Sequence, residues 1–129
     1  MFVDASVLVA ILLEADDAKE LSARIERSER RLTSPLSIYE AALAVCRVHS
    51  KSVPEAESRV RALVRLAGIP IEPVVDETAS LALEAHAKFG KGRHPARLNM
   101  GDCFAYAMAK HHGVPLLYKG DDFSQTDLA

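Results

Sequence analysis

The chain has 129 residues, the size of one domain, because two domains of half this length would each bury too little apolar surface. Apolar residues make up 49 % of it and charged residues 26 %, which excludes a disordered or collagen-like chain. Eighteen acidic residues against sixteen basic ones give a formal net charge of −2, which argues against a protein whose whole surface binds nucleic acid. We expect a single globular domain over residues 1–129.

The first apolar run, Val7–Leu13, is too short to span a bilayer and has no basic leader before it. Cys46 and Cys103 lie far apart without a CxxC pattern, so we expect free buried thiols, with one disulfide as the alternative. The five histidines lack zinc-type spacing. These features predict a cytoplasmic protein with no membrane segment.

The first half of the chain predicts strands alternating with helices. A short strand at Met1–Asp4 runs into a helical pattern at Ala5–Glu14. A second helix starts at Asp16–Asp17 and reaches about Ser28, with acids in its first turn, where the helix dipole favours them. Arg31–Ser34 can form a short strand, and a helix opening at Pro35 or Ser37 is expected to end near His49.

The second half continues the alternation. Its predicted elements, in chain order, are a helix with Pro54 in its first turn and Gly68 as its stop, a strand at Ile69–Val75, a helix capped by Asp76 and ended by Gly90, a basic loop at Lys91–Leu98, a helix from Asn99 or Gly101 to about His112, a strand at Val114–Tyr118 and a loop-like tail. Such an alternation predicts an α/β domain with a small parallel sheet covered on both faces.

Acidic residues follow two of the predicted strands. Asp4 comes directly after the first strand, and Asp121 and Asp122 come just after the last one. In open α/β sheets, ligands bind at the carboxyl ends of strands. The alternatives are local: Asp4 can cap the following helix, with Ser6 as a rival cap, and Gly-Asp-Asp is good turn composition.

Two further acids lie on apolar helix faces. Glu40 shares its face with Leu36 and Leu43, and Asp102 shares its face with Tyr106 and Ala109. Burying a lone carboxylate is costly unless a partner or a metal compensates it. A salt bridge from Glu40 to an Arg, and capping of its own helix by Asp102, are the alternatives.

These acids can all converge at one edge of the sheet. Converging carboxylates repel one another, which raises some of their pKa values unless a cation lies between them. A site with only oxygen ligands selects a hard ion such as Mg²⁺ or Mn²⁺. Such a site suits phosphoryl chemistry, in which the ion activates water and neutralises charge on the phosphate.

The segments around these acids resemble the PIN-domain ribonuclease toxins of the VapC family, in order and over almost the whole chain. The matching segments are Val3–Ser6, Ser37–Ala41, Asn99–Tyr106 and Leu117–Phe123. The resemblance implies a PIN-like three-layer α/β/α sandwich with a small central parallel sheet. It also implies a Mg²⁺-dependent endoribonuclease, with Mn²⁺ as an alternative ion, that acts as the toxin of a type II toxin–antitoxin pair. A homodimer and a VapB-type antitoxin are the implied partners.

Carried over by motif, Asp4, Glu40 and Asp102 match the first three acids of the family. The family pattern places the fourth acid before Phe, which favours Asp122 and leaves Asp121 open. We expect Asp4 and Asp102 to hold the metal whose activated water cleaves RNA, with Glu40 and Asp122 completing the pocket. Ser6 and Asn99 are expected to support the acids from behind.

A group of basic residues just before the Asp102 helix can attract RNA to this acidic site. It consists of Lys88, Lys91, Arg93, His94 and Arg97. Among them, Lys91, Arg93 and Arg97 are the predicted RNA contacts, because neutralising phosphates holds the strand and makes binding salt-dependent. The alternative is a solvated loop.

Two other functions can be weighed against this one. A catalytically silent binding module can have the same scaffold, but it gains nothing from four repelling acids. A phosphotransfer receiver domain needs a phosphoacceptor Asp at the end of a central strand. The predicted strand at Ile69–Val75 offers only Asp76, which is in a capping position.

Overall fold

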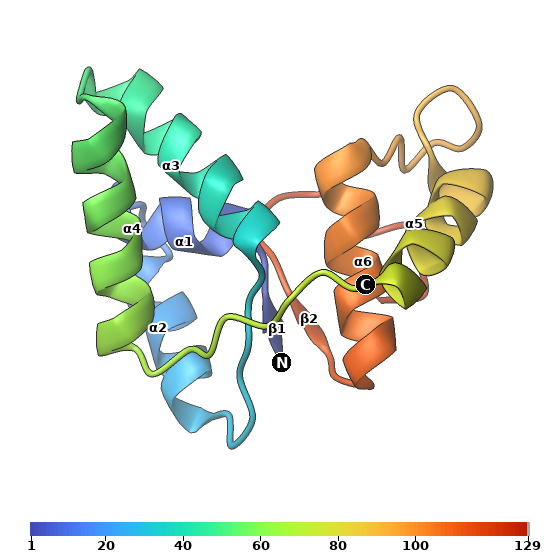
Figure 1. The fold of residues 1–129 in the computed structure, drawn as a ribbon, viewed down its shortest axis with the longest axis horizontal. Helices are drawn as coiled ribbons and strands as arrows, with labels where there is room; N and C mark the ends of the chain where they lie inside the picture. Colours follow the sequence, from blue (N-terminus) through green and yellow to red (C-terminus); the bar gives the residue numbers. More distant parts are fainter. Residues whose placement is uncertain (129) are drawn as a thin grey trace.

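A two-residue strand at the start of the chain lies between two groups of helices. The computed structural model describes residues 1–128. Its elements, in chain order, are β1 (Phe2–Val3), α1 (Ala5–Leu12), α2 (Ala18–Arg27), α3 (Pro35–His49), α4 (Val53–Leu66), α5 (Asp76–Phe89), α6 (Met100–His112) and β2 (Leu116–Leu117). Helices α1 to α4 lie on one side of the strands, and α5 and α6 lie on the other (Figure 1). The predicted three-layer α/β/α arrangement is confirmed.

The sheet is parallel and small. Phe2 and Val3 of β1 are in register with Leu116 and Leu117 of β2. On the other side of β1, Leu32 forms a parallel bridge to Phe2. Because the strands are parallel, their carboxyl ends meet at one edge of the sheet. Asp4 and the segment that follows β2 both lie at this edge.

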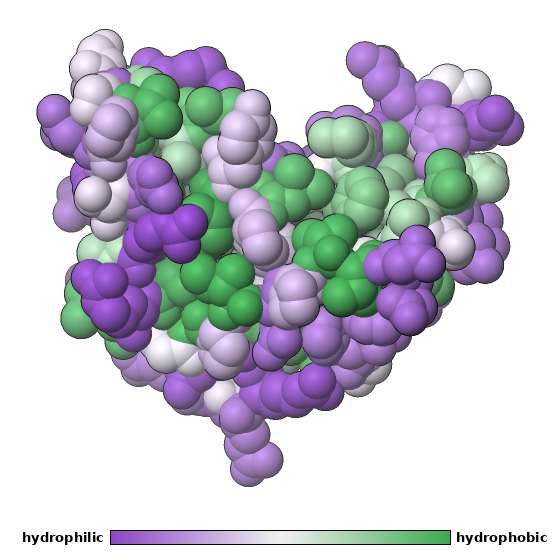
Figure 2. Space-filling model, viewed as in Figure 1, coloured by the Kyte–Doolittle hydropathy of each residue, from purple (hydrophilic) through white to green (hydrophobic). Residues whose placement is uncertain are grey.

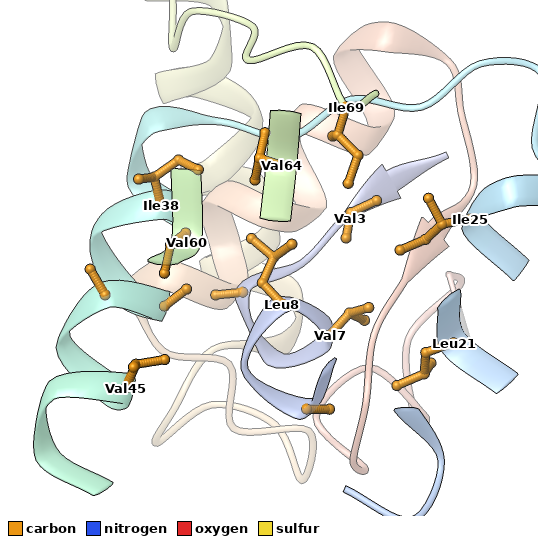
Figure 3. Packing of buried hydrophobic residues seen from close by; sticks show 14 of the residues in the cluster. Val3, Val7, Leu8, Leu21, Ile25, Ile38, Val45, Val60, Val64 and Ile69 are labelled. Atoms are coloured by element: carbon orange, nitrogen blue, oxygen red, sulfur yellow. The ribbon is translucent and has the colours of Figure 1, made fainter. Parts of the chain in front are cut away.

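The two strands divide the apolar core between the helical layers. Successive side chains of a strand point to opposite faces. Phe2 and Leu116 therefore lie in the cluster under α5 and α6, whereas Val3 and Leu117 lie in the cluster under α1 to α4. Figure 3 shows the second of these clusters, with side chains from β1, α1, α3 and α4 packed together.

The prediction of a strand at Ile69–Val75 is wrong. Only Ile71 of this segment forms a bridge, to Thr33, and the rest is neither strand nor helix. Pro70 and Pro73 have no backbone N–H to donate, which keeps the segment from forming a continuous ladder.

The predicted cap of α5 is also wrong. Val75 occupies the N-cap position and makes no side-chain capping bond, and Asp76 is already in the first turn. An acid there still faces the positive end of the helix dipole. The stops at Gly68 and Gly113 occur where expected, and both glycines adopt the left-handed conformation (φ 64° and 63°) that ends a helix.

Cys46 and Cys103 are both free, as predicted, and Cys103 is buried while Cys46 is only partly so. Within residues 1–128, no helix has the length and apolar content needed to cross a membrane.

Shortening a core side chain tests the packing between the helices and β1. Leu8 is fully buried in the cluster under α1 to α4, so we expect Leu8→Ala to lower the free energy of unfolding by about 2–5 kcal/mol in urea titrations followed by circular dichroism. The same change at Leu66, which is 85 % exposed on α4, is the matched control and should cost less than about 0.5 kcal/mol. Equal losses in the two variants would contradict this packing.

Candidate active site

Asp4, a predicted site residue, is the N-cap of α1. Its Oδ2 accepts hydrogen bonds from the Ser6 amide (3.1 Å) and the Ser6 hydroxyl (2.5 Å), and these bonds cap α1. Asp4 is buried, with only 6 % of its surface exposed. The Ser6 Oγ also accepts the backbone N–H of Lys119 at 3.0 Å. Ser6 therefore links the end of β1 to the segment after β2.

Asp102 is held by the start of its own helix. The backbone N–H of Asp102 donates to Asn99 Oδ1 (2.9 Å), and the backbone N–H of Asn99 donates to Asp102 Oδ2 (3.1 Å). This reciprocal pair is a capping box at the N-terminus of α6. It fixes the direction of the Asp102 carboxylate, which is 9 % exposed.

Glu40 comes from the other helical layer. It is half-buried on α3, and a Cβ atom at position 101 would overlap its carboxylate, so Glu40 lies directly against the Gly101 backbone in the first turn of α6. A glycine at this position lets α3 and α6 approach closely. None of the salt bridges within residues 1–128 includes Glu40, so the expected Arg alternative is not observed.

The structure separates the two candidates for the fourth acid. Both side chains are exposed after β2, but the charge of Asp122 raises the pKa of Asp4 and that of Asp102, whereas Asp121 affects neither. The Asp121 carbonyl instead accepts bonds from the Ser124 amide (3.1 Å) and hydroxyl (2.7 Å). Asp122 is thus the acid near Asp4 and Asp102.

The acids repel one another. Burial first, and then the charges of Asp4 and Asp102, raise the pKa of Glu40 to about 7. Burial, opposed by the Asn99 amide and reinforced by Asp122 and Asp4, raises the pKa of Asp102 to about 7. Burial also raises the pKa of Asp4, against the hydrogen bonds from Ser6. We call Asp4, Glu40, Asp102 and Asp122 the carboxylate cluster.

The carboxylate cluster fits a hard divalent cation in its donor type. Its side-chain donors are all carboxylate oxygens, and a cation between them would relieve the repulsion that raises their pKa values. Within residues 1–128, however, no three His, Cys, Asp or Glu side chains form a ready-made metal site. The metal-binding and catalytic roles of these four carboxylates stay predictions.

The acids come from the two sides of a notch. Figure 1 shows α3 and the first turn of α6 on opposite sides of the gap between the helical layers, and Figure 2 shows that the surface is hollowed there. Glu40 belongs to α3, and Asp102 belongs to the first turn of α6.

The basic loop leads directly into the capping box of α6. Gly90 and Leu98 form a parallel bridge that closes it. Lys88 at the end of α5 and the loop residues Lys91, Arg93 and Arg97 are exposed. His94 differs from them, because its ring packs edge-on against Phe89 at 5.2 Å and its Nδ1 accepts the Ala96 amide at 3.0 Å. His94 therefore shapes the loop, and the exposed cations are free to meet a ligand.

Two features of the site were not predicted from the sequence. One is the contact of Glu40 with Gly101, for which the glycine in the first turn of a helix was the available signal. The other is a bond from the Tyr106 hydroxyl to Asp127 at 2.7 Å. The sequence placed Tyr106 on the apolar face of α6, where it is indeed buried, but the partner of its hydroxyl lies 21 positions away.

Comparisons with known proteins agree with this architecture. The PIN domain family matches residues 1–128. A VapC ribonuclease of Rhizobium meliloti (strain 1021) is 42 % identical, and the match covers 98 % of each chain. Ribonuclease VapC30 of Mycobacterium tuberculosis is 38 % identical over 100 % of this chain and 96 % of its own.

Two solved structures share the fold. Mycobacterium tuberculosis VapC20, a sarcin-ricin loop cleaving toxin, has a TM-score of 0.75 at 21 % identity over 99 % of this chain and 95 % of that one. A chain of a toxin–antitoxin complex from Klebsiella pneumoniae has a TM-score of 0.69 at 17 % identity, covering 98 % and 92 %. With relatives of this identity aligned from end to end, the chain belongs to the PIN-domain family and, within it, to the VapC ribonucleases.

Proposed function

We propose that this protein is the endoribonuclease toxin of a type II toxin–antitoxin pair, and that it cleaves RNA with Mg²⁺, or Mn²⁺ in its place, at the carboxylate cluster. The observation that carries the proposal is the convergence of Asp4, Glu40, Asp102 and Asp122, two of which have pKa values raised to about 7. Perturbed acids gathered in a hollow are typical of a functional site. Membership of the VapC ribonucleases supports RNA as the substrate.

Each residue of the site has a distinct part in this reaction. Asp4 and Asp102 would hold the ion, and the bonds from Ser6 and from Asn99 keep their oxygens in place. Glu40 and Asp122 would accept hydrogen bonds from water and so orient it toward the phosphorus. When bound, the ion supplies an activated water and neutralises charge on the phosphate.

Four carboxylates repel the phosphates of RNA, so RNA binding requires a positively charged surface beside them. We assign this part to Lys91, Arg93 and Arg97, which are exposed in the loop before Asn99 and Asp102. Cations in the loop that leads into α6 can hold phosphates while the acids act on one of them. The overall charge of −2 is an average over the whole chain and does not reveal such regions of opposite charge.

The proposed protein partners are a VapB-type antitoxin and a second copy of the chain. Support for an antitoxin comes from the fold shared with a chain of the Klebsiella pneumoniae toxin–antitoxin complex. An antitoxin Arg inserted between two carboxylates would suit this site, because a guanidinium can pair with both.

The free thiols of Cys46 and Cys103 are typical of a reducing compartment, which supports a cytoplasmic location.

An exposed apolar groove supports the homodimer. It has a volume of about 700 Å³ between α5 and α6, and it is bordered by Leu83 and Met100, which are 69 % and 67 % exposed. Covering such a patch with a second copy removes apolar area from water. A mass of one chain in sedimentation at micromolar concentration would contradict the homodimer.

Removal of single carboxylates tests the reaction. Purified protein should cleave RNA with Mg²⁺ and lose cleavage in EDTA, and Asp4→Asn and Asp102→Asn should each lower the rate more than about 100-fold. Asp122→Asn should also lower it, whereas the neighbouring Asp121→Asn should leave it unchanged. Cleavage that is equal with EDTA and in all variants would identify a contaminating nuclease, and an inactive pure protein that still binds RNA would favour a catalytically silent module.

The raised pKa values predict how stability depends on pH without metal. Glu40 and Asp102 have pKa values of about 7 in the folded protein and ordinary values of 4.5 and 3.8 when unfolded. The folded state therefore binds more protons between these values, so these groups make the free energy of unfolding fall as pH rises from about 4 through 7. In urea titrations at pH 5.5 and 8, Glu40→Gln and Asp102→Asn should each reduce this fall. A pH dependence identical to that of the wild type would contradict the raised pKa values.

The basic loop is tested through the salt dependence of RNA binding, measured in EDTA so that the RNA stays intact. Arg93→Ala and Arg97→Ala together should weaken binding and reduce the slope of log K against log[salt] by about 1.4, since each phosphate contact with single-stranded RNA contributes about 0.7. Arg65→Ala removes an equally exposed Arg from α4 and should leave the slope unchanged. A wild-type slope in the double variant would show that Arg93 and Arg97 are solvated and do not contact RNA.

A further inference from the structure

One face of α6 carries both a member of the carboxylate cluster and two side chains that bind the C-terminal tail. Asp102, Tyr106 and Lys110 are spaced by four positions, so they follow one another along the same side of the helix. Asp102 belongs to the carboxylate cluster, and the other two side chains bind the end of the chain. Within residues 119–128, the backbone forms turns and no helix or strand, so this tail depends on such contacts for its position.

The contacts between this face and the tail meet at Asp127. Its Oδ1 accepts a hydrogen bond from the Tyr106 hydroxyl at 2.7 Å, and its Oδ2 accepts one from Lys110 Nζ at 2.6 Å. Tyr106 is only 5 % exposed. A buried phenol needs an acceptor, and a charged acceptor makes the bond stronger than a neutral one.

A short packed segment connects Asp127 to Asp122. The Phe123 side chain is buried, and its ring meets Tyr118 edge-on with 5.1 Å between centroids. The Phe123 carbonyl accepts the Thr126 hydroxyl (2.8 Å) and amide (3.1 Å), which closes the turn. A movement of Asp127 away from α6 is thereby transmitted to Phe123 and to its neighbour Asp122.

Asp122 needs such a restraint. It is exposed on a turn, and it faces the like charges of Asp4 and Asp102. Repulsion by these charges would favour positions of an unrestrained Asp122 that lie farther from them.

We propose that Tyr106 and Asp127 are positioning residues that hold Asp122 at the carboxylate cluster, with Lys110 as a second donor. Helix α6 then places two of the four acids, Asp102 through its capping box and Asp122 through the opposite end of the same face. The inference deepens the proposed function and rests on it for its effect on cleavage, while the attachment of the tail to α6 is independent of any activity.

The first test measures the tail itself in metal-free protein. Tyr106→Phe removes only the hydroxyl that donates to Asp127 and keeps the buried ring. Amide hydrogen exchange at Ser124 and Thr126, whose N–H groups close the turns of the tail, should become at least about tenfold faster. Exchange in α3 and α4 should not change. Tyr39→Phe removes the same atom from a side chain that is 62 % exposed, and should leave the tail at the wild-type rate.

The second test is a double-variant cycle on RNA cleavage. Tyr106→Phe and Asp127→Ala should each lower kcat about tenfold with little change in KM. Either change added to Asp122→Asn should cause no further loss, because the residue being positioned is already neutral. A merely structural effect would lower kcat by the same factor in both backgrounds.

The outcomes separate the two proposals. Wild-type exchange in Tyr106→Phe, or equal losses with and without Asp122, would overturn the positioning role. Faster exchange in a protein that does not cleave RNA would retain the attachment of the tail and overturn the ribonuclease function.

Discussion

Asp4, Glu40 and Asp102 bring three negative charges into one partly buried region, and Asp122 adds a fourth at its rim. Burial and mutual repulsion raise the pKa of Glu40 and of Asp102 to about 7, so the arrangement is unfavourable unless something balances it. Protons balance it at lower pH, and a divalent cation can balance it at neutral pH. The other features of the site hold these charges together.

Each acid is restrained by a different part of the fold. Ser6 fixes Asp4 at the end of β1 and also binds the Lys119 amide, so it joins two neighbouring strand ends. The capping box with Asn99 fixes Asp102. Gly101 lets Glu40 approach from the opposite helical layer. A two-stranded parallel sheet is sufficient here because it only has to bring these helix and strand ends to one edge.

Much of this arrangement could be predicted from local patterns. Helix stops at Gly68 and Gly113, the Asn99 cap and the acids after strands are signals carried by a few adjacent residues. The strand expected at Ile69–Val75 is reduced to the single bridge of Ile71, because Pro70 and Pro73 have no backbone N–H to donate. The preference for Asp122 over Asp121 came from the local Asp122-Phe123 pattern, whereas the bond from Tyr106 to Asp127 depends on how the tail packs on α6, which no local pattern contains.

Binding of Mn²⁺ tests most directly the claim that the carboxylates form one metal site. The concentration of free Mn²⁺ is measured by electron paramagnetic resonance at pH 8, where Glu40 and Asp102 are ionised. The account predicts saturable binding to the wild type and at least about tenfold weaker binding to Asp4→Asn and to Asp102→Asn. Asp121→Asn should bind as the wild type does. Equal binding by all four proteins, or no binding to the wild type, would contradict the account.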